Sequence, residues 1–137
     1  MAINWILAGS NLFGTFPLYK AIQAGKHKEA YLIGGLMIAS GLMHISETKH
    51  HLTPPIFQKY SGIFLNIDRG LSIIIPLLYR DRIIDRLPDV LPLGAMGVIC
   101  LLIGEIKTDD PTFNTIFYPG LHLIWHACVY SLIYKLL

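Results

Sequence analysis

Long apolar stretches recur along this chain, separated by short segments that contain charged residues, glycine or proline. Crossing the hydrocarbon core of a membrane, about 30 Å thick, takes roughly 20 mostly apolar residues at 1.5 Å of helical rise each. Five stretches come close to that length: residues 3–19, 29–46, 60–79, 88–104 and 112–134. The pattern therefore predicts an all-α protein, with residues 1–137 forming one domain, an integral membrane bundle of about five transmembrane helices.

The composition agrees with a membrane protein. Hydrophobic residues make up 53% of the chain and charged residues only 15%, whereas soluble domains are about 25% charged. So few charges cannot cover a water-facing surface, and the remaining apolar side chains must face lipid. The net charge of +2 and the absence of a basic run give no reason to expect a nucleic-acid partner.

Basic residues are distributed unequally over the two predicted membrane faces. The loops near residues 26 and 82 and the C-terminal end share one face, and the remaining loops share the other. The first face carries Lys20, Lys26, Lys28, Arg80, Arg82, Arg86 and Lys135, and the second carries Lys49, Lys59 and Lys107. The positive-inside rule then predicts a multi-pass protein with a non-cytoplasmic N-terminus and a cytoplasmic C-terminus.

Five polar residues stand out in the predicted spans, where an Asp, Lys or Arg side chain costs about 2.5–3.5 kcal/mol on insertion scales. They are Ser40, His44, Asp68, His122 and His126. Side chains this costly usually pair, bind an ion or line a polar cavity. We therefore take these five as the candidate site.

His122 and His126 are four residues apart, so on a helix both imidazoles face the same side. Two such rings can bind one metal ion, although two histidines that only hydrogen-bond neighbouring helices would show the same spacing. Ser40 and His44 have the same spacing, and a membrane serine often just bonds its own backbone. Asp68 cannot face its neighbour Arg69 on a helix, but it could also lie in the wet interface.

The predicted topology places all five residues toward the same membrane face. The second span ends there, whereas the third and fifth spans begin there. His44, His122 and His126 can therefore meet, with Asp68 and Ser40 nearby. Three histidines with an open fourth position are typical of a catalytic zinc site.

The order Ser40-x-x-x-His44, then Asp68, then His122-x-x-x-His126 resembles the CREST superfamily. This group includes alkaline ceramidases, the adiponectin and progestin receptors, and haemolysin-III-like proteins. The resemblance covers motif order and helix position; members usually have seven spans, against five here. It implies that the three histidines bind Zn²⁺ and that the substrate is a membrane lipid with an amide or ester bond, such as ceramide. A second copy or another membrane protein could complete the shorter bundle.

In that interpretation Asp68 and Ser40 are the catalytic residues of a zinc-dependent lipid amidohydrolase. Asp68 would act as general base toward a metal-activated water, and Ser40 would orient the water or donate to the developing oxyanion. We expect no cofactor other than zinc. The alternative within the same site is a non-catalytic zinc-binding membrane protein with a structural or receptor-like role.

Two further interpretations use other residues. A haem or di-iron protein would draw on His44, His50, His51, His122 and His126, but the lipid desaturases of that kind need about eight histidines and this chain has six. A helical protein whose polar residues only mediate packing would account for the small residues Gly34, Gly35, Gly94 and Gly97. It would not account for histidines and a carboxylate at a common depth.

Overall fold

The computed structural model describes residues 2–47 and 57–137, and every regular element in these ranges is helical. The elements are α1 (Ala2–Ser10), the 3₁₀ helix η1 (Asn11–Gly14), α2 (Thr15–Gln23), α3 (His27–Ile45), the 3₁₀ helix η3 (Gln58–Tyr60), α4 (Ser61–Leu78), α5 (Arg80–Asp85), α6 (Leu87–Gly104), the π-helical turn η4 (Phe113–Phe117) and α7 (Tyr118–Leu136). The all-α prediction is confirmed for these residues. His50 and His51 lie outside them.

In the described part of the chain, three helical segments are long and apolar enough to cross a membrane: Gln58–Leu78, Leu87–Gly104 and Phe113–Leu136. They correspond to the third, fourth and fifth predicted spans. The first two predicted spans are helical as well, but they do not meet this criterion. Helices α1 and α2 have nine residues each, and α3 begins with the polar sequence His27-Lys28-Glu29. The count of five spans therefore stays a prediction.

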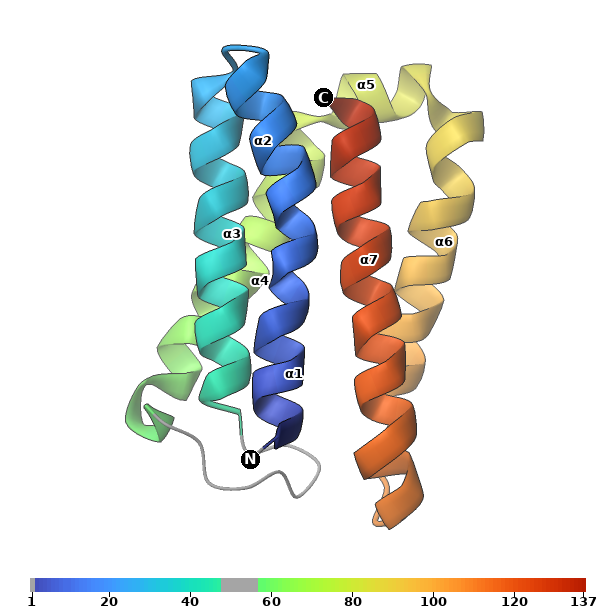
Figure 1. Ribbon diagram of the computed structural model, residues 1–137. Coiled ribbons are helices and arrows are strands. Elements are labelled where there is room, and N and C mark those ends of the chain that lie inside the picture. Colours follow the sequence, from blue (N-terminus) through green and yellow to red (C-terminus); the bar gives the residue numbers. More distant parts are fainter. Residues whose placement is uncertain (1, 48–56) are drawn as a thin grey trace.

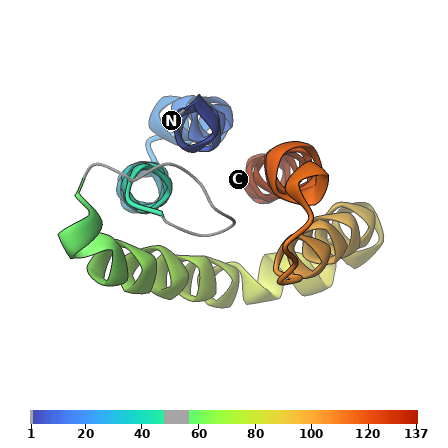
Figure 2. The same ribbon diagram turned by 90° about the horizontal axis from the view of Figure 1, so that it is seen from below.

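The helices form an open arc. α7 packs against α6 on one side and against α1, η1 and α2 on the other, while α3 packs against α1 and α2 and also against α4. Figure 1 shows α1 and α2 as one column between α3 and α7. Seen along the bundle in Figure 2, α4 and α6 form the two ends of the arc, and the short α5 connects them.

Close helix contact in this arc depends on Gly14, at the end of η1. A Cβ atom on Gly14 would lie 2.5 Å from Met37 Cγ and 2.7 Å from Tyr130 Cε1. A side chain at this position would fit only if Met37 and Tyr130 moved, so glycine lets the first column lie close to both α3 and α7.

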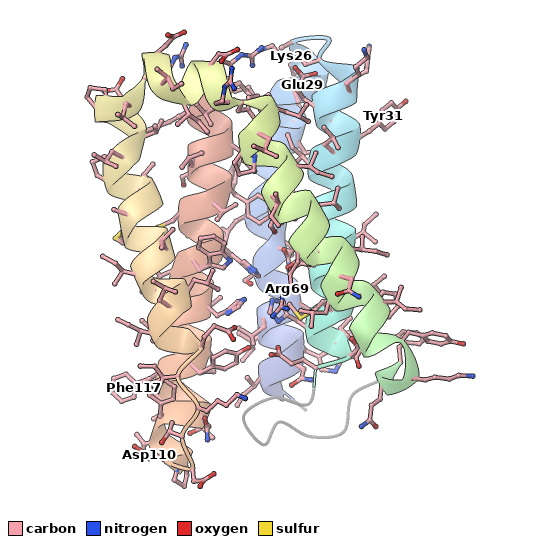
Figure 3. All side chains as sticks on the ribbon, turned by 180° about the vertical axis from the view of Figure 1, so that it is seen from behind. Lys26, Glu29, Tyr31, Arg69, Asp110 and Phe117 are labelled. Atoms are coloured by element: carbon pink, nitrogen blue, oxygen red, sulfur yellow. The ribbon has the colours of Figure 1, made fainter. Side chains whose placement is uncertain are left out.

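Large apolar side chains cover the outside of the arc. Leu12, Phe16 and Leu77 each expose about two-thirds of their surface (66%, 67% and 65%). Figure 3 shows Tyr31, which is 80% exposed, pointing away from α3. An apolar exterior of this kind suits lipid rather than water.

The apolar core occupies the half of the bundle that contains the α2–α3 turn, the end of α4 and the end of α7. It is formed by Ala21, Ala30, Ile33, Leu36, Ile75, Tyr79, Val90, Tyr130, Ile133 and Leu136. The other half contains the buried polar side chains. These include Asn4, Ser10, Ser40, His44, His122 and His126. The candidate site thus lies in the polar half.

Candidate metal centre

Three buried histidines form a compact triangle in the polar half of the bundle. The ring centroids of His44 and His122 are 4.6 Å apart, those of His44 and His126 are 5.2 Å apart, and those of His122 and His126 are 4.9 Å apart. One nitrogen from each ring can be chosen so that all three atoms lie within 4.8 Å of one another. The three histidines are therefore close enough to bind one metal ion.

Two helices supply this triangle. His122 and His126 are one turn apart in α7 and face the interior of the arc, as the spacing predicts. His44 lies in the last turn of α3, whose polar end reaches the same level as the first half of α7. The side chain of His44 is fully buried.

The ring of His44 has one nitrogen bonded and one without a partner. Nδ1 lies 3.1 Å from Oε2 of Glu47, while Nε2 is buried and has no hydrogen-bond partner among the described residues. An ionised carboxylate can only accept, so Nδ1 carries a proton, and in the neutral ring the lone pair is then on Nε2. A buried nitrogen lone pair without a partner is costly unless it binds something. This atom is the strongest sign that the cluster is built for a metal ion.

Ser10, at the end of α1, fixes the ring of His126 in the same way. Its hydroxyl donates to the Leu7 carbonyl oxygen at 2.6 Å and lies 2.5 Å from Nδ1 of His126. Because the hydroxyl proton is used by the carbonyl, the serine oxygen must accept a hydrogen bond from Nδ1. Nε2 of His126 is then the unprotonated nitrogen. In both rings the outer partner lies at Nδ1, as in metal-binding histidines held by an outer partner, so Nε2 is the nitrogen that could bind a metal ion.

Glu47 is held in place by the residues around it. Its Oε1 accepts a hydrogen bond from the Tyr118 hydroxyl at 2.9 Å, and its backbone carbonyl accepts one from Asn4 Nδ2 at 2.9 Å. Burial favours the neutral acid, but the hydrogen bonds from His44 and Tyr118, together with the positive charge of His44 and His122 when they are protonated, outweigh it, and the pKa of Glu47 lies below its ordinary value. An ionised Glu47 carboxylate can accept the Nδ1 proton of His44.

Asp68 and Ser40 lie beside the triangle. Asp68 projects from α4 into a cavity of about 460 Å³ that His122 also lines. Its carboxylate accepts a hydrogen bond from the Ser40 hydroxyl, whose oxygen is 3.5 Å from Nε2 of His126. All five residues singled out in the sequence therefore come together at one level of the bundle. Whether Asp68 and Ser40 are catalytic stays a prediction.

The sequence reasoning did not identify the outer partners of the histidines. Glu47 lies three residues after His44, on the same helical face, and that spacing was the available signal. Ser10 had a weaker signal: it is a polar residue next to Asn11 in an otherwise apolar stretch, but adjacent residues on a helix do not face the same side. Nothing in the sequence connects Ser10 with α7, and only the packing does so.

Three neutral imidazoles suit Zn²⁺, and also Cu, Fe or Ni. Four-coordinate zinc is bound at about 2.0–2.1 Å per nitrogen, so three rings leave a fourth position for water or substrate. The cavity beside His122 is large enough to hold such a ligand. The arrangement can thus bind a metal ion with an open position next to a carboxylate.

Comparisons of the chain with protein-family models, curated proteins and solved structures found no match.

Proposed function

We propose that this chain is a zinc-dependent membrane hydrolase that cleaves an amide or ester bond of a neutral lipid such as ceramide. The observation that carries the proposal is the buried, unpartnered Nε2 of His44, in a triangle of three histidines next to Asp68. A metal that only held the helices together would not need a carboxylate and a cavity beside it. The motif order shared with the CREST superfamily supports the same function.

His44, His122 and His126 would hold the ion. Zinc, when bound, supplies Lewis acidity and a nucleophilic water at neutral pH. Asp68 would take a proton from the water while the water oxygen adds to the carbonyl carbon of the lipid. Asp68 would then give that proton to the leaving amine or alcohol as the C–N bond of an amide, or the C–O bond of an ester, breaks. Ser40 holds the Asp68 carboxylate through its hydroxyl and can turn to donate to the carbonyl oxygen.

The proposal includes a topology of five spans, with the N-terminus outside and the C-terminus in the cytoplasm. In that arrangement the histidines lie in the outer half of the membrane. Single-cysteine labelling of intact cells, in a Cys100→Ser/Cys128→Ser background, tests it. A cysteine at Lys26 should be protected from an impermeant reagent, and one at Lys107 should react; the reverse result would overturn the orientation.

Metal analysis of the purified protein tests the ligand assignment. We expect about one zinc per wild-type chain and none in His122→Ala. His27→Ala is the matched control, because His27 is exposed at the opposite end of α3 and should leave zinc unchanged. Full zinc occupancy in His122→Ala would remove the assignment.

Hydrolysis of a labelled ceramide separates an enzyme from a non-catalytic zinc protein. Asp68→Asn should keep its zinc and lose activity by about 100-fold or more, within the range of general acid–base contributions. Zinc without hydrolysis of amide or ester lipids in the wild-type protein would favour the structural or receptor-like alternative.

A further inference from the structure

Two cavities adjoin each other on the open side of the arc. The cavity beside the histidines is lined by Glu47, Asp68, Arg69, Glu105 and His122, among others. The second cavity, about 180 Å³, has an almost entirely apolar lining. Ser72 and Trp125 line both cavities, so the two cavities lie next to each other; we call them together the groove, whose one end is polar and whose other end is apolar.

The groove lies between two helix pairs. α4 packs on α3, and α6 packs on α7. Figures 2 and 3 show that α4 and α6 come closest near α5 and diverge toward the histidine end. Both helices line the two cavities, so in a membrane an acyl chain would enter them between α4 and α6.

We infer that the apolar cavity holds one acyl chain of a neutral lipid, with the polar linkage of that lipid beside His122 and Asp68. The inference rests on the proposed hydrolase function and specifies the part of the substrate that the chain itself recognises. An amphiphile fits because the groove changes from polar to apolar along its length. The groove would place a bond near the polar head, rather than one within the acyl chain, next to the histidines.

The size of the apolar cavity excludes a helix of a second copy as the occupant. Along α4 the cavity runs from Ser72 to Tyr79, which is about 10 Å of helix. A helix with its side chains is about 10–12 Å in diameter and would need several times the 180 Å³ present over that length. A single hydrocarbon chain is narrow enough.

The charges at the polar end favour a neutral head group over a phosphate. The lining contains three carboxyl groups, from Glu47, Asp68 and Glu105, and one guanidinium, from Arg69. In Figure 3 Arg69 points from α4 toward the side of α6 and α7. If all four groups are charged, their net charge is negative, and a divalent ion at the histidines would bring it only to zero. The groove therefore offers a phosphate no net positive charge.

Gly94 keeps the apolar cavity open. It lines that cavity from α6, and a Cβ atom there would lie 3.6 Å from Leu132 Cδ1, an ordinary contact. A leucine at this position should therefore be accommodated by the backbone while its side chain occupies the groove. Gly34 of α3 lines neither cavity and has open space around it, so Gly34→Leu is the matched control.

The test is photo-crosslinking in phosphatidylcholine nanodiscs with a ceramide whose acyl chain carries a diazirine and a terminal alkyne. We expect label on residues 72–79 and 93–98. Gly94→Leu should reduce the labelling about tenfold, the loss expected when roughly two methylene groups are no longer buried. Gly34→Leu should label as the wild type does. A phosphatidic acid with the same chain should label the groove less than the ceramide.

Unlabelled ceramide should compete with the probe on the wild-type protein, so the test does not depend on the folding of Gly94→Leu. Label spread evenly over the outer faces, no competition, or a crosslink between two copies across α4 and α6 would overturn the inference. Groove labelling without zinc or hydrolysis would refute only the proposed function. Zinc and hydrolysis without groove labelling would refute only the acyl-chain site.

Discussion

The polar groups at the two ends of α7 differ in how completely they are hydrogen-bonded. Near its C-terminal end, cationic side chains from other segments reach the backbone carbonyls of the last turn. Lys20 Nζ donates to the Tyr134 carbonyl at 2.8 Å, and Arg82 Nη1 donates to the Leu136 carbonyl at 3.1 Å. These contacts satisfy carbonyls that the helix cannot pair itself, and they complement its dipole.

Around the first half of α7, where the last turn of α3 brings His44 beside His122 and His126, the buried polar groups are held in place but not all are satisfied. Ser10 and Glu47 occupy one nitrogen each of His126 and His44, while Nε2 of His44 has no hydrogen-bond partner among residues 2–47 and 57–137. The comparison shows how to separate stability from binding in a small bundle. The paired carbonyls at the C-terminal end of α7 stabilise the fold, whereas the His44 nitrogen beside two further imidazoles is positioned to bind a ligand.

Among these variants, removal of one histidine ring of the triangle should have the largest effect on zinc affinity. Loss of an outer hydrogen-bond partner can weaken metal binding by about 100-fold. His44→Ala removes a ligand itself, so it should weaken zinc binding by more than that. Competition with a fluorescent chelator measures this affinity. Arg86→Ala, which removes a contact of 2.6 Å to the Lys135 carbonyl at the other end, should leave the affinity unchanged. Equal affinities in the two variants would erase the distinction between the ends.

Glu47→Gln should have the next largest effect. The amide keeps the shape but loses the charge that holds the Nδ1 proton of His44, so zinc affinity should fall by about 10–100-fold. Glu29→Gln, at the far end of α3, is the control and should behave like the wild type. An unchanged affinity in Glu47→Gln would show that His44 does not need this carboxylate.

Ser10→Ala should weaken zinc binding by about tenfold, toward the lower end of that range, because a neutral hydroxyl is a weaker acceptor than a carboxylate. Ser46 provides a closely matched control. Its hydroxyl is also buried and donates to the carbonyl three residues earlier, at 2.9 Å from Met43 O, but it makes no contact with a histidine ring that the structure records. Comparable losses in Ser10→Ala and Ser46→Ala would assign the effect to helix packing.

Arg82→Ala should have the smallest effect. An exposed cation at a helix C-terminus contributes about 0.3–1 kcal/mol, so the variant should unfold slightly more easily and bind zinc normally. Unfolding in a denaturing detergent, followed by circular dichroism, measures the loss. A fall in zinc affinity in this variant would show that the two ends of the bundle are coupled.

The sequence predicted much of this architecture because lipid imposes a simple rule of length and hydropathy. The predicted stretch 60–79 corresponds to α4 at Ser61–Leu78, and 88–104 corresponds to α6 at Leu87–Gly104. The histidine triangle was predictable for a similar reason, since helical spacing and chain direction alone set the level of each ring. Zinc, the reaction and the orientation in the membrane stay predictions.

The sequence did not reveal which helices are neighbours. Hydropathy makes every span look alike, and it does not say that α7 lies between the first column and α6. The Ser10 contact and the groove between α4 and α6 both follow from that order. Gly14 explains how the first column can lie close to both α3 and α7, but this is clear only once the positions of Met37 and Tyr130 are known.

The hydrogen bond from Ser10 to the Leu7 carbonyl also bears on how the protein is made. Ser10 and His126 are separated by 116 positions. At 5–20 residues per second the ribosome needs about 6–23 s to travel from one to the other. During that interval the first helix is already synthesised and its future partner is not. Because the Ser10 hydroxyl donates to a carbonyl of its own helix, its proton is already hydrogen-bonded before α7 is synthesised. Its oxygen can then accept a hydrogen bond from His126 once α7 packs against α1.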